Sequence, residues 1–157
     1  MQSGITAYKY ILLLGFIVWA YDSRSQVKNP DSLPQGCVQL TADEMKWIDT
    51  LSTLPKGTQF CQLYGDIKKE GPFAVRLKLP PNLVLKTHYH PNDEVVTVLE
   101  GSIFIGLEGA PISRTSKEFK PGSFYVNAKH IRHQVNVGPN GATIQINSMG
   151  PWKVIFE

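Results

Sequence analysis

From about residue 57 onward, apolar and polar residues alternate in short runs that are rich in Val, Ile, Phe and Tyr. A period of two is typical of strands with one buried face, and short strands between turn residues indicate an all-β sandwich or barrel. Turns are expected where Gly and Pro gather, at 80–81, 100–101, 121–122 and 138–141. The predicted strands are residues 58–64, 73–79, 84–90, 95–99, 103–107, 124–126, 134–137, 143–146 and 152–156.

The region before residue 57 has a different pattern. Residues 26–36 are polar, contain two prolines and a glycine, and predict an extended arm. Thr41, with Glu44 three residues later, is a capping-box signal, which predicts one short helix from there to about Leu54. The chain is therefore expected to consist of a leader at 1–25, an arm with one short helix at 26–56, and a β domain at 57–157.

The first 25 residues have the pattern of a secretory signal peptide. Lys9 is the only charged residue before Asp22, and it precedes an apolar run at 11–20. This run is shorter than the ~18 or more apolar residues that span a bilayer comfortably. An uncleaved anchor is the alternative, because Trp19 and Tyr21 could lie at a membrane interface. We expect an exported protein, periplasmic or secreted, whose mature domain does not bind membranes.

Composition narrows the class of protein. A length of 157 residues suits one folded domain, and 42% apolar with 18% charged residues excludes disorder driven by charge. The 16 basic and 13 acidic residues are scattered along the chain, so nothing indicates a nucleic-acid partner. In an exported protein Cys37 and Cys61 could form a disulfide, or they could remain two separate buried thiols. Both alternatives stay open.

The four histidines of the chain all fall between residues 88 and 133. His88 and His90 are two residues apart, so on a strand they point to the same face. Glu94 follows after a turn, and His133 comes from a distant strand. Three imidazoles and one carboxylate could hold a divalent transition metal ion (Fe, Mn, Ni, Zn or Cu) with a position open for water or substrate. The alternative is a polar pocket that holds no functional metal.

The sequence H-Y-H-P-N-D-E-V-V-T-V-L-E-G at 88–101 resembles the first cupin motif, G-x5-H-x-H-x3–4-E-x6-G. Asn82 stands in place of the leading glycine, and Asn tolerates a left-handed backbone better than most residues. The second motif, G-x5-P-x-G-x2-H-x3-N, maps onto 122–137. Its first glycine and its histidine match, while Ala128, His130 and Val137 replace the proline, the second glycine and the asparagine.

This resemblance implies a double-stranded β-helix, a jelly-roll barrel, over about 57–157. It implies a metal ion in the mouth of the barrel, with His88, His90, Glu94 and His133 as the ligands, and often a homodimer. More narrowly, the chain resembles small exported bacterial single-domain cupins. The predicted function is a metal-dependent enzyme that acts on a small organic molecule, as a dioxygenase-like oxidoreductase or an isomerase. The alternative is a cupin that binds or senses a small molecule without turnover.

Other polar residues could also line the pocket. His130 could be an acid/base group or an alternative ligand, although a solvated loop residue is the preferred interpretation. Arg76 could bind a substrate carboxylate if its face points into the barrel, but we favour a solvated edge. Gln145 and Asn147 share one strand face and could hydrogen-bond a ligand, or they could be ordinary strand residues. Large aromatic side chains are expected in the core or rim first and as substrate contacts second, and they are Phe104, Phe124, Tyr125 and Trp152.

Overall fold

The computed structural model describes residues 33, 35–49, 54–108, 110, 112 and 116–156. The predicted leader at 1–25 and residues 26–32 of the predicted arm lie outside this set. Residues Gln35–Glu157 form one compact unit. Among the described residues, no helix has the length and hydropathy needed to cross a membrane.

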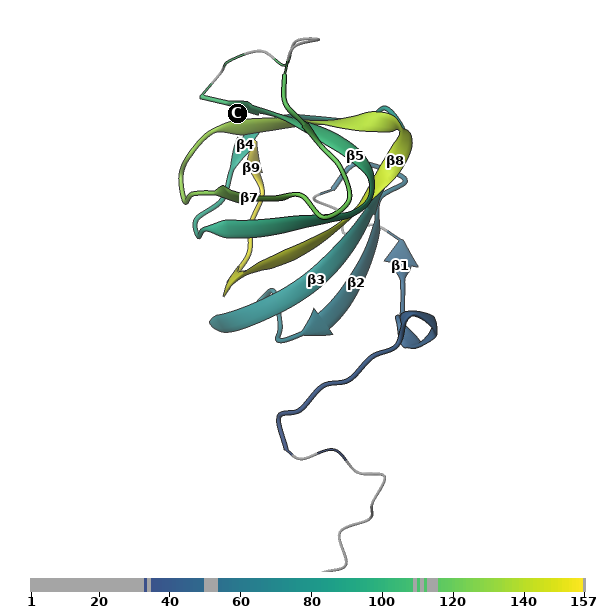
Figure 1. Ribbon diagram of the computed structural model, residues 1–157. Helices are drawn as coiled ribbons and strands as arrows, with labels where there is room; N and C mark the ends of the chain where they lie inside the picture. The colour runs from purple at the N-terminus through teal and green to yellow at the C-terminus, as the bar shows by residue number, and fades with distance from the viewer. Residues whose placement is uncertain are drawn as a thin grey trace, which may run out of the picture. The chain divides into compact units, whose positions relative to one another are not determined.

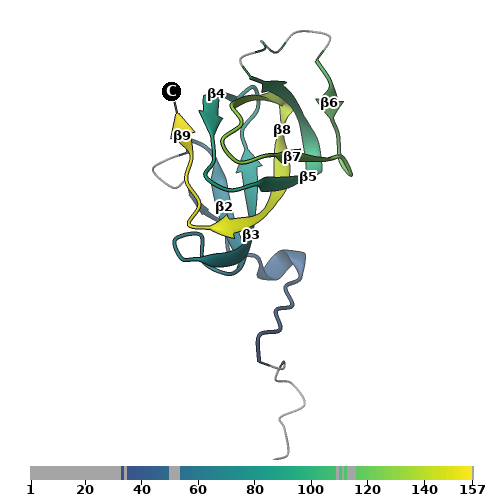
Figure 2. The same cartoon turned by 90° about the vertical axis from the view of Figure 1, so that its left-hand side faces the viewer.

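The described part of the chain folds into nine strands that hydrogen-bond in one antiparallel sheet. The elements are the 3-10 helix η1 (Ala42–Glu44), β1 (Ile48–Asp49), β2 (Gln59–Tyr64), β3 (Gly71–Leu79), β4 (Val84–Tyr89), β5 (Glu94–Leu107), β6 (Glu118–Phe119), β7 (Phe124–Asn127), β8 (His133–Gly150) and β9 (Ile155–Phe156). The strand order is β1-β2-β3-β8-β4-β9, and β5 pairs with β6, β7 and β8. Figure 1 shows β2 and β3 side by side while β5 and β8 curve over to close the barrel, and Figure 2 shows β9 beside β4. The predicted all-β barrel is confirmed.

Two of the predicted turns prove to be bends inside long strands. β5 runs through 100–101 and β8 runs through 138–141, so each replaces two predicted strands. The two strands stay paired on both sides of the bend, for example at Val96↔Ile146 before it and Ile105↔Val135 after it. At the bend Gly101 has a φ of +67°, and a Cβ there would run into the carbonyl oxygen of Gly141. The sequence marks the bend correctly, but it does not show that the ladder continues through it.

The core fills the inside of the barrel. Alternate residues of β3 are buried, beginning at Phe73, while the residues between them face outward. β5 and β8 contribute the same alternation from the opposite wall, because a period of two places every second side chain on the inner face. The most deeply buried aliphatic side chains are Val75, Val96, Val98, Ile103 and Ile146.

The predicted helix from Thr41 to about Leu54 is much shorter in the structure. The Glu44 carboxylate does accept hydrogen bonds from the Thr41 N–H and hydroxyl, both at 2.8 Å. Among the described residues of this stretch (41–49 and 54) the backbone is helical only at Ala42–Glu44, and Met45 is already extended. Ile48–Asp49 then pairs with β2 as an edge strand. A helix of a few residues is marginal on its own, so the hydrogen bonds of the sheet edge prevail over the local capping signal.

Cys37 and Cys61 are both free thiols. Cys61 is buried in β2, whereas Cys37 is exposed. Of the two alternatives for the cysteines, the structure therefore has separate thiols, although only one of them is buried.

Candidate metal centre

The fold brings three of the four predicted ligands together inside the barrel. His88 lies directly opposite His133 in the pairing of β4 with β8, and their ring centroids are 4.2 Å apart. His90 comes just after β4, and one ligand nitrogen from each of the three histidines lies within 4.8 Å of the others. All three side chains are buried, with exposures of 1–2%. The convergence that strand periodicity predicts is confirmed for these three residues.

A β-bulge in β4 aims His88 into the barrel. Leu85 pairs with Val135 and His88 pairs with His133, so β4 advances by three residues between these pairs while β8 advances by two. The extra residue lets Leu85 and His88 both point inward, although they are three positions apart in a strand. Bulges of this kind re-aim side chains and occur next to functional sites.

Backbone carbonyls fix the orientation of each imidazole. His88 Nδ1 lies 2.7 Å from the Lys86 carbonyl oxygen, and His90 Nδ1 lies 2.8 Å from that of Lys153. His133 Nδ1 contacts the Ile131 carbonyl oxygen at 3.1 Å. A carbonyl only accepts, so in the neutral ring Nδ1 carries the proton and Nε2 keeps its lone pair.

The Nε2 atoms of His90 and His133 are buried and have no hydrogen-bond partner. Buried polar atoms in folded proteins nearly always have a partner, so an unpaired lone pair in this position needs an explanation. A metal ion supplies one, because neutral imidazole with its other nitrogen held by a carbonyl is the usual form of a histidine ligand. The residues present therefore fit a transition metal ion.

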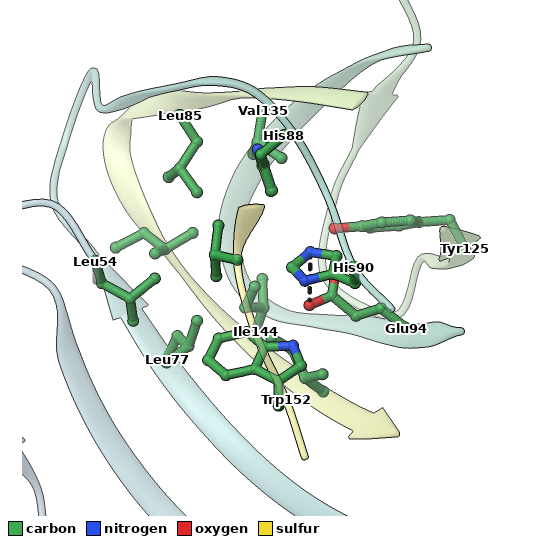
Figure 3. A pocket seen from close by; sticks show the side chains of 13 residues that line it. Leu54, Leu77, Leu85, His88, His90, Glu94, Tyr125, Val135, Ile144 and Trp152 are labelled. Atoms are coloured by element: carbon green, nitrogen blue, oxygen red, sulfur yellow. Dashed lines mark ion pairs between the residues drawn. The ribbon is translucent and has the colours of Figure 1, made fainter. Parts of the chain in front are cut away.

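Glu94, the first residue of β5, lies beside His90 rather than within the histidine group. Its Oε1 is 3.4 Å from His90 Nε2 (Figure 3), and its Oε2 accepts a hydrogen bond of 3.0 Å from Asn127 Nδ2. Glu94 and Asn127 are directly paired between β5 and β7, and both are buried. Asn127 holds one carboxylate oxygen and leaves the other facing the histidines. Glu94 as the fourth ligand stays a prediction.

Burial controls the protonation of this site. Burial first and the neighbouring His133 second lower the pKa of His88 from its ordinary 6.5 to about 3. Burial likewise lowers the pKa of His133. The pKa of Tyr125 is raised well above its ordinary value, by burial first and by the nearby Glu94 carboxylate second. At neutral pH these groups are therefore two neutral imidazoles and a protonated phenol.

His88, His90 and Glu94 face a narrow cavity with an apolar wall. The cavity leaves about 30 Å³ for the centres of water-sized molecules, which is room for about two waters. Figure 3 shows the Tyr125 hydroxyl and the Trp152 indole turned toward this space, and the Trp152 ring stacks on His90 at 5.7 Å between centroids. Aliphatic side chains form the rest of the wall, and they are Leu54, Leu77, Leu79, Leu85, Val135, Ile144, Ile146 and Val154.

Arg76, Gln145 and Asn147 lie on the other face of the sheet. The Arg76 Nε–H donates to Gln145 Oε1 at 3.1 Å, and Gln145 Nε2 donates to Asn147 Oδ1 at 3.3 Å. Their neighbours along the strands, such as Ile144, line the cavity instead. As expected, Arg76 does not line the cavity, but it is half-buried on β3, between β2 and β8, and not at a solvated edge. Gln145 and Asn147 do not line the cavity either.

His130 lies outside the barrel. Its side chain is exposed, with its ring 6.0 Å from that of Tyr89, and its backbone N–H donates to the His90 carbonyl oxygen at 2.9 Å. His130 has a φ of +63°, and Asn82 has a φ of +57°. Both stand where the cupin motifs have glycine, so the left-handed turns are kept although the glycines are not. His130 belongs to the turn that carries His133, and not to the ligand group.

Three residues near the site carried no sequence signal strong enough to assign them. Asn127 ends a short strand, where a polar residue is common and indicates no particular function. Tyr125 and Trp152 were expected in the core or rim, and their polar atoms reach the cavity. The carbonyl groups that hold the imidazoles are backbone atoms, so no residue type could indicate them.

Comparison with known proteins supports the same fold. The polyketide cyclase RemF from Streptomyces resistomycificus superposes with a TM-score of 0.62 at 18% identity, covering 75% of this chain and 83% of that one. An RmlC-like cupin from Shewanella frigidimarina superposes with a TM-score of 0.54 at 15% identity, covering 70% and 87%. This chain has the cupin fold.

A curated relative agrees with this assignment. Germin-like protein 1 of Brassica napus is 34% identical over 88 residues, which is 54% of this chain and 42% of that protein. This cupin barrel thus spans about two-fifths of the curated relative that it matches. No protein-family model matches the chain.

Proposed function

We propose that this cupin binds one divalent transition metal ion through His88, His90 and His133, with Glu94 as the fourth ligand, and uses it in a reaction of a small molecule. The buried, unpartnered Nε2 atoms of His90 and His133 carry the proposal. Their Nδ1 atoms are already held by carbonyl groups, so both Nε2 lone pairs are free to coordinate an ion, and Glu94 Oε1 lies 3.4 Å from that of His90.

The residues around the ion have separate tasks. When bound, the ion supplies Lewis acidity and lowers the pKa of the donor atom that it coordinates. Glu94 would offer Oε1 to the ion beside His90, while Asn127 holds the other carboxylate oxygen in place. The aliphatic wall excludes bulk water, which strengthens each polar interaction inside.

We propose an enzyme, a dioxygenase-like oxidoreductase or an isomerase, that works in the exported compartment. RemF, which shares the fold, is a polyketide cyclase, so this barrel does host catalysis in another protein. Export is supported by the apolar run at 11–20 after Lys9. A homodimer is part of the same proposal, and exposed Phe124 and Val126 on β7 would suit such an interface.

The second candidate is a cupin that binds or senses a small molecule without turnover. One observation favours it. Among the described residues that line the cavity, Glu94 and Tyr125 are the only titratable side chains besides histidine, and Glu94 is itself the proposed fourth ligand. Few groups are therefore available to move protons during a reaction.

The metal-loaded protein should be assayed for oxygen uptake and for conversion of a panel of small organic molecules. We expect turnover that disappears in Glu94→Gln and His88→Ala and persists in His130→Ala, because His130 lies outside the barrel. Saturable binding of a panel member without its conversion would support the binding protein instead. Turnover that survives in His88→Ala would contradict the proposed metal chemistry.

A further inference from the structure

With the proposed metal ion bound, the net charge of the cavity follows from its ligands. Three neutral imidazoles and the Glu94 carboxylate around a divalent ion leave one net positive charge. Among the described residues that line the cavity there is no Lys, no Arg and no second carboxylate. The side chain of Arg76, which could have supplied a cation, lies on the outer face of the sheet. The cavity therefore has one unit of positive charge and no means of balancing a second negative one.

Two neutral hydrogen-bond donors face the same space. The Tyr125 hydroxyl is turned into the cavity, as Figure 3 shows. The Trp152 indole N–H is buried and has no hydrogen-bond partner. Its ring is held in place by stacking on His90 and by an edge contact with Phe73 at 6.3 Å, and its backbone N–H donates to the Ile67 carbonyl oxygen at 2.7 Å.

An unpaired indole N–H is best explained by a ligand that accepts its hydrogen bond, because a buried donor without a partner is destabilising. Indole donates only, so the ligand atom that meets it must be an acceptor. A carboxylate oxygen, or a similar anionic acceptor atom, satisfies this N–H and also balances the single positive charge.

Resting on the proposed metal site, we propose that the cavity binds a small monoanion with a short apolar remainder and disfavours dianions and neutral molecules. With a neutral ligand the site keeps a net charge of plus one, and with a dianion it has a net charge of minus one. In an apolar wall either residual charge is unfavourable. The space of about 30 Å³ for atom centres limits the ligand to a few non-hydrogen atoms in this conformation.

The proposal is tested by calorimetry on the zinc-loaded protein with two pairs of molecules of equal shape. Acetate and acetamide differ in one charge, as do oxalate and oxamate. We expect acetate to bind at least about 10-fold more tightly than acetamide, and oxamate to bind more tightly than oxalate, because only the monoanion leaves no buried charge unbalanced. In water oxalate chelates divalent ions better than oxamate, so a preference for oxamate would come from the protein.

The two donors are tested with matched variants. Tyr125→Phe and Trp152→Phe should each weaken acetate binding by about 10- to 100-fold, the effect of one hydrogen bond to a charged group. Tyr64→Phe and Trp47→Phe are the controls and should leave it unchanged, since Tyr64 is exposed and Trp47 packs under the Lys78 ammonium instead of in the cavity.

Each outcome bears on one proposal. Failure to take up zinc would overturn the proposed function itself. Zinc uptake with acetamide equal to acetate, with oxalate tighter than oxamate, or with both donor variants like their controls would overturn the monoanion proposal and leave the metal site standing. Binding of acetate with no binding of either larger anion would support it through the size limit.

Discussion

Replacing Asn127 by Ala tests how much the buried carboxylate of the site depends on its amide partner. Asn127 Nδ2 donates to Glu94 Oε2 at 3.0 Å, and the exposures of the two side chains are 2% and 5%. The variant leaves a buried carboxylate oxygen without this donor. A hydrogen bond to a charged group contributes about 1.5–3 kcal/mol, so we expect the free energy of unfolding of the metal-free protein to fall by about that amount.

The same change should also weaken metal binding. Glu94 loses the contact that holds its second oxygen while the first faces His90. Loss of such an outer partner typically lowers metal affinity by about 10- to 100-fold. Asn127→Asp keeps the side-chain volume and puts two carboxylates side by side, so it should destabilise the metal-free protein at least as much as the alanine variant does.

Urea unfolding and a competitive metal titration measure the two effects. Asn147→Ala is the matched control, because Asn147 is exposed on the outer face of β8, where its Oδ1 accepts a hydrogen bond from Gln145 Nε2. Its free energy of unfolding should stay within about 0.5 kcal/mol of the parent protein. If Asn127→Ala matched this control in both stability and metal affinity, the assigned role of the amide would be refuted.

Three further changes follow from the backbone and from burial. His130→Gly should raise the free energy of unfolding by about 0.5–1 kcal/mol, because glycine adopts the φ of +63° without strain, and metal content should not change; a destabilised variant would contradict this. Gly101→Ala should destabilise the fold far more than Gly122→Ala. Both glycines have a positive φ, but only at Gly101 would a Cβ strike the opposing strand. Equal melting temperatures of the two variants would refute the assigned bend. The metal-free protein should lose stability as pH falls from 6.5 toward 5. In this range His88, with a pKa of about 3, and His133 stay unprotonated in the folded protein, whereas both bind protons in the unfolded chain. The free energy of unfolding should fall by up to about 1.4 kcal/mol per pH unit for each histidine. Equal urea midpoints at pH 7.5 and pH 5 would contradict the assigned burial.

The sequence was sufficient for the barrel and for the three histidines. A period of two and the spacing of His88 and His90 describe one strand face, and His133 stands where the second cupin motif places its histidine. The β4 bulge that turns Leu85 and His88 inward together could not be read from residue types, because it depends on how β4 pairs with a strand far along the chain.

Other features could not be predicted from the sequence for similar reasons. The capping signal at Thr41 was real, but pairing of Ile48–Asp49 with β2 ended the helix after one turn. The glycines at 101 and 141 marked bends, and only the long-range ladder between β5 and β8 shows that the strands continue. His130 is exposed, in line with the preferred interpretation of a solvated loop residue, but its positive φ could not be read from the sequence. In each case contacts between distant segments decided the local outcome.

The central claim is that three buried histidines inside the barrel hold a metal ion. The most direct measurement is the metal content of the purified protein by elemental analysis, beside His133→Ala and His130→Ala. The parent protein and His130→Ala should carry about one transition metal ion per chain, and His133→Ala should lose it, because each of the cluster's nitrogens is needed for tight binding. A metal-free parent protein, or a His133→Ala variant that keeps the ion, would contradict the account.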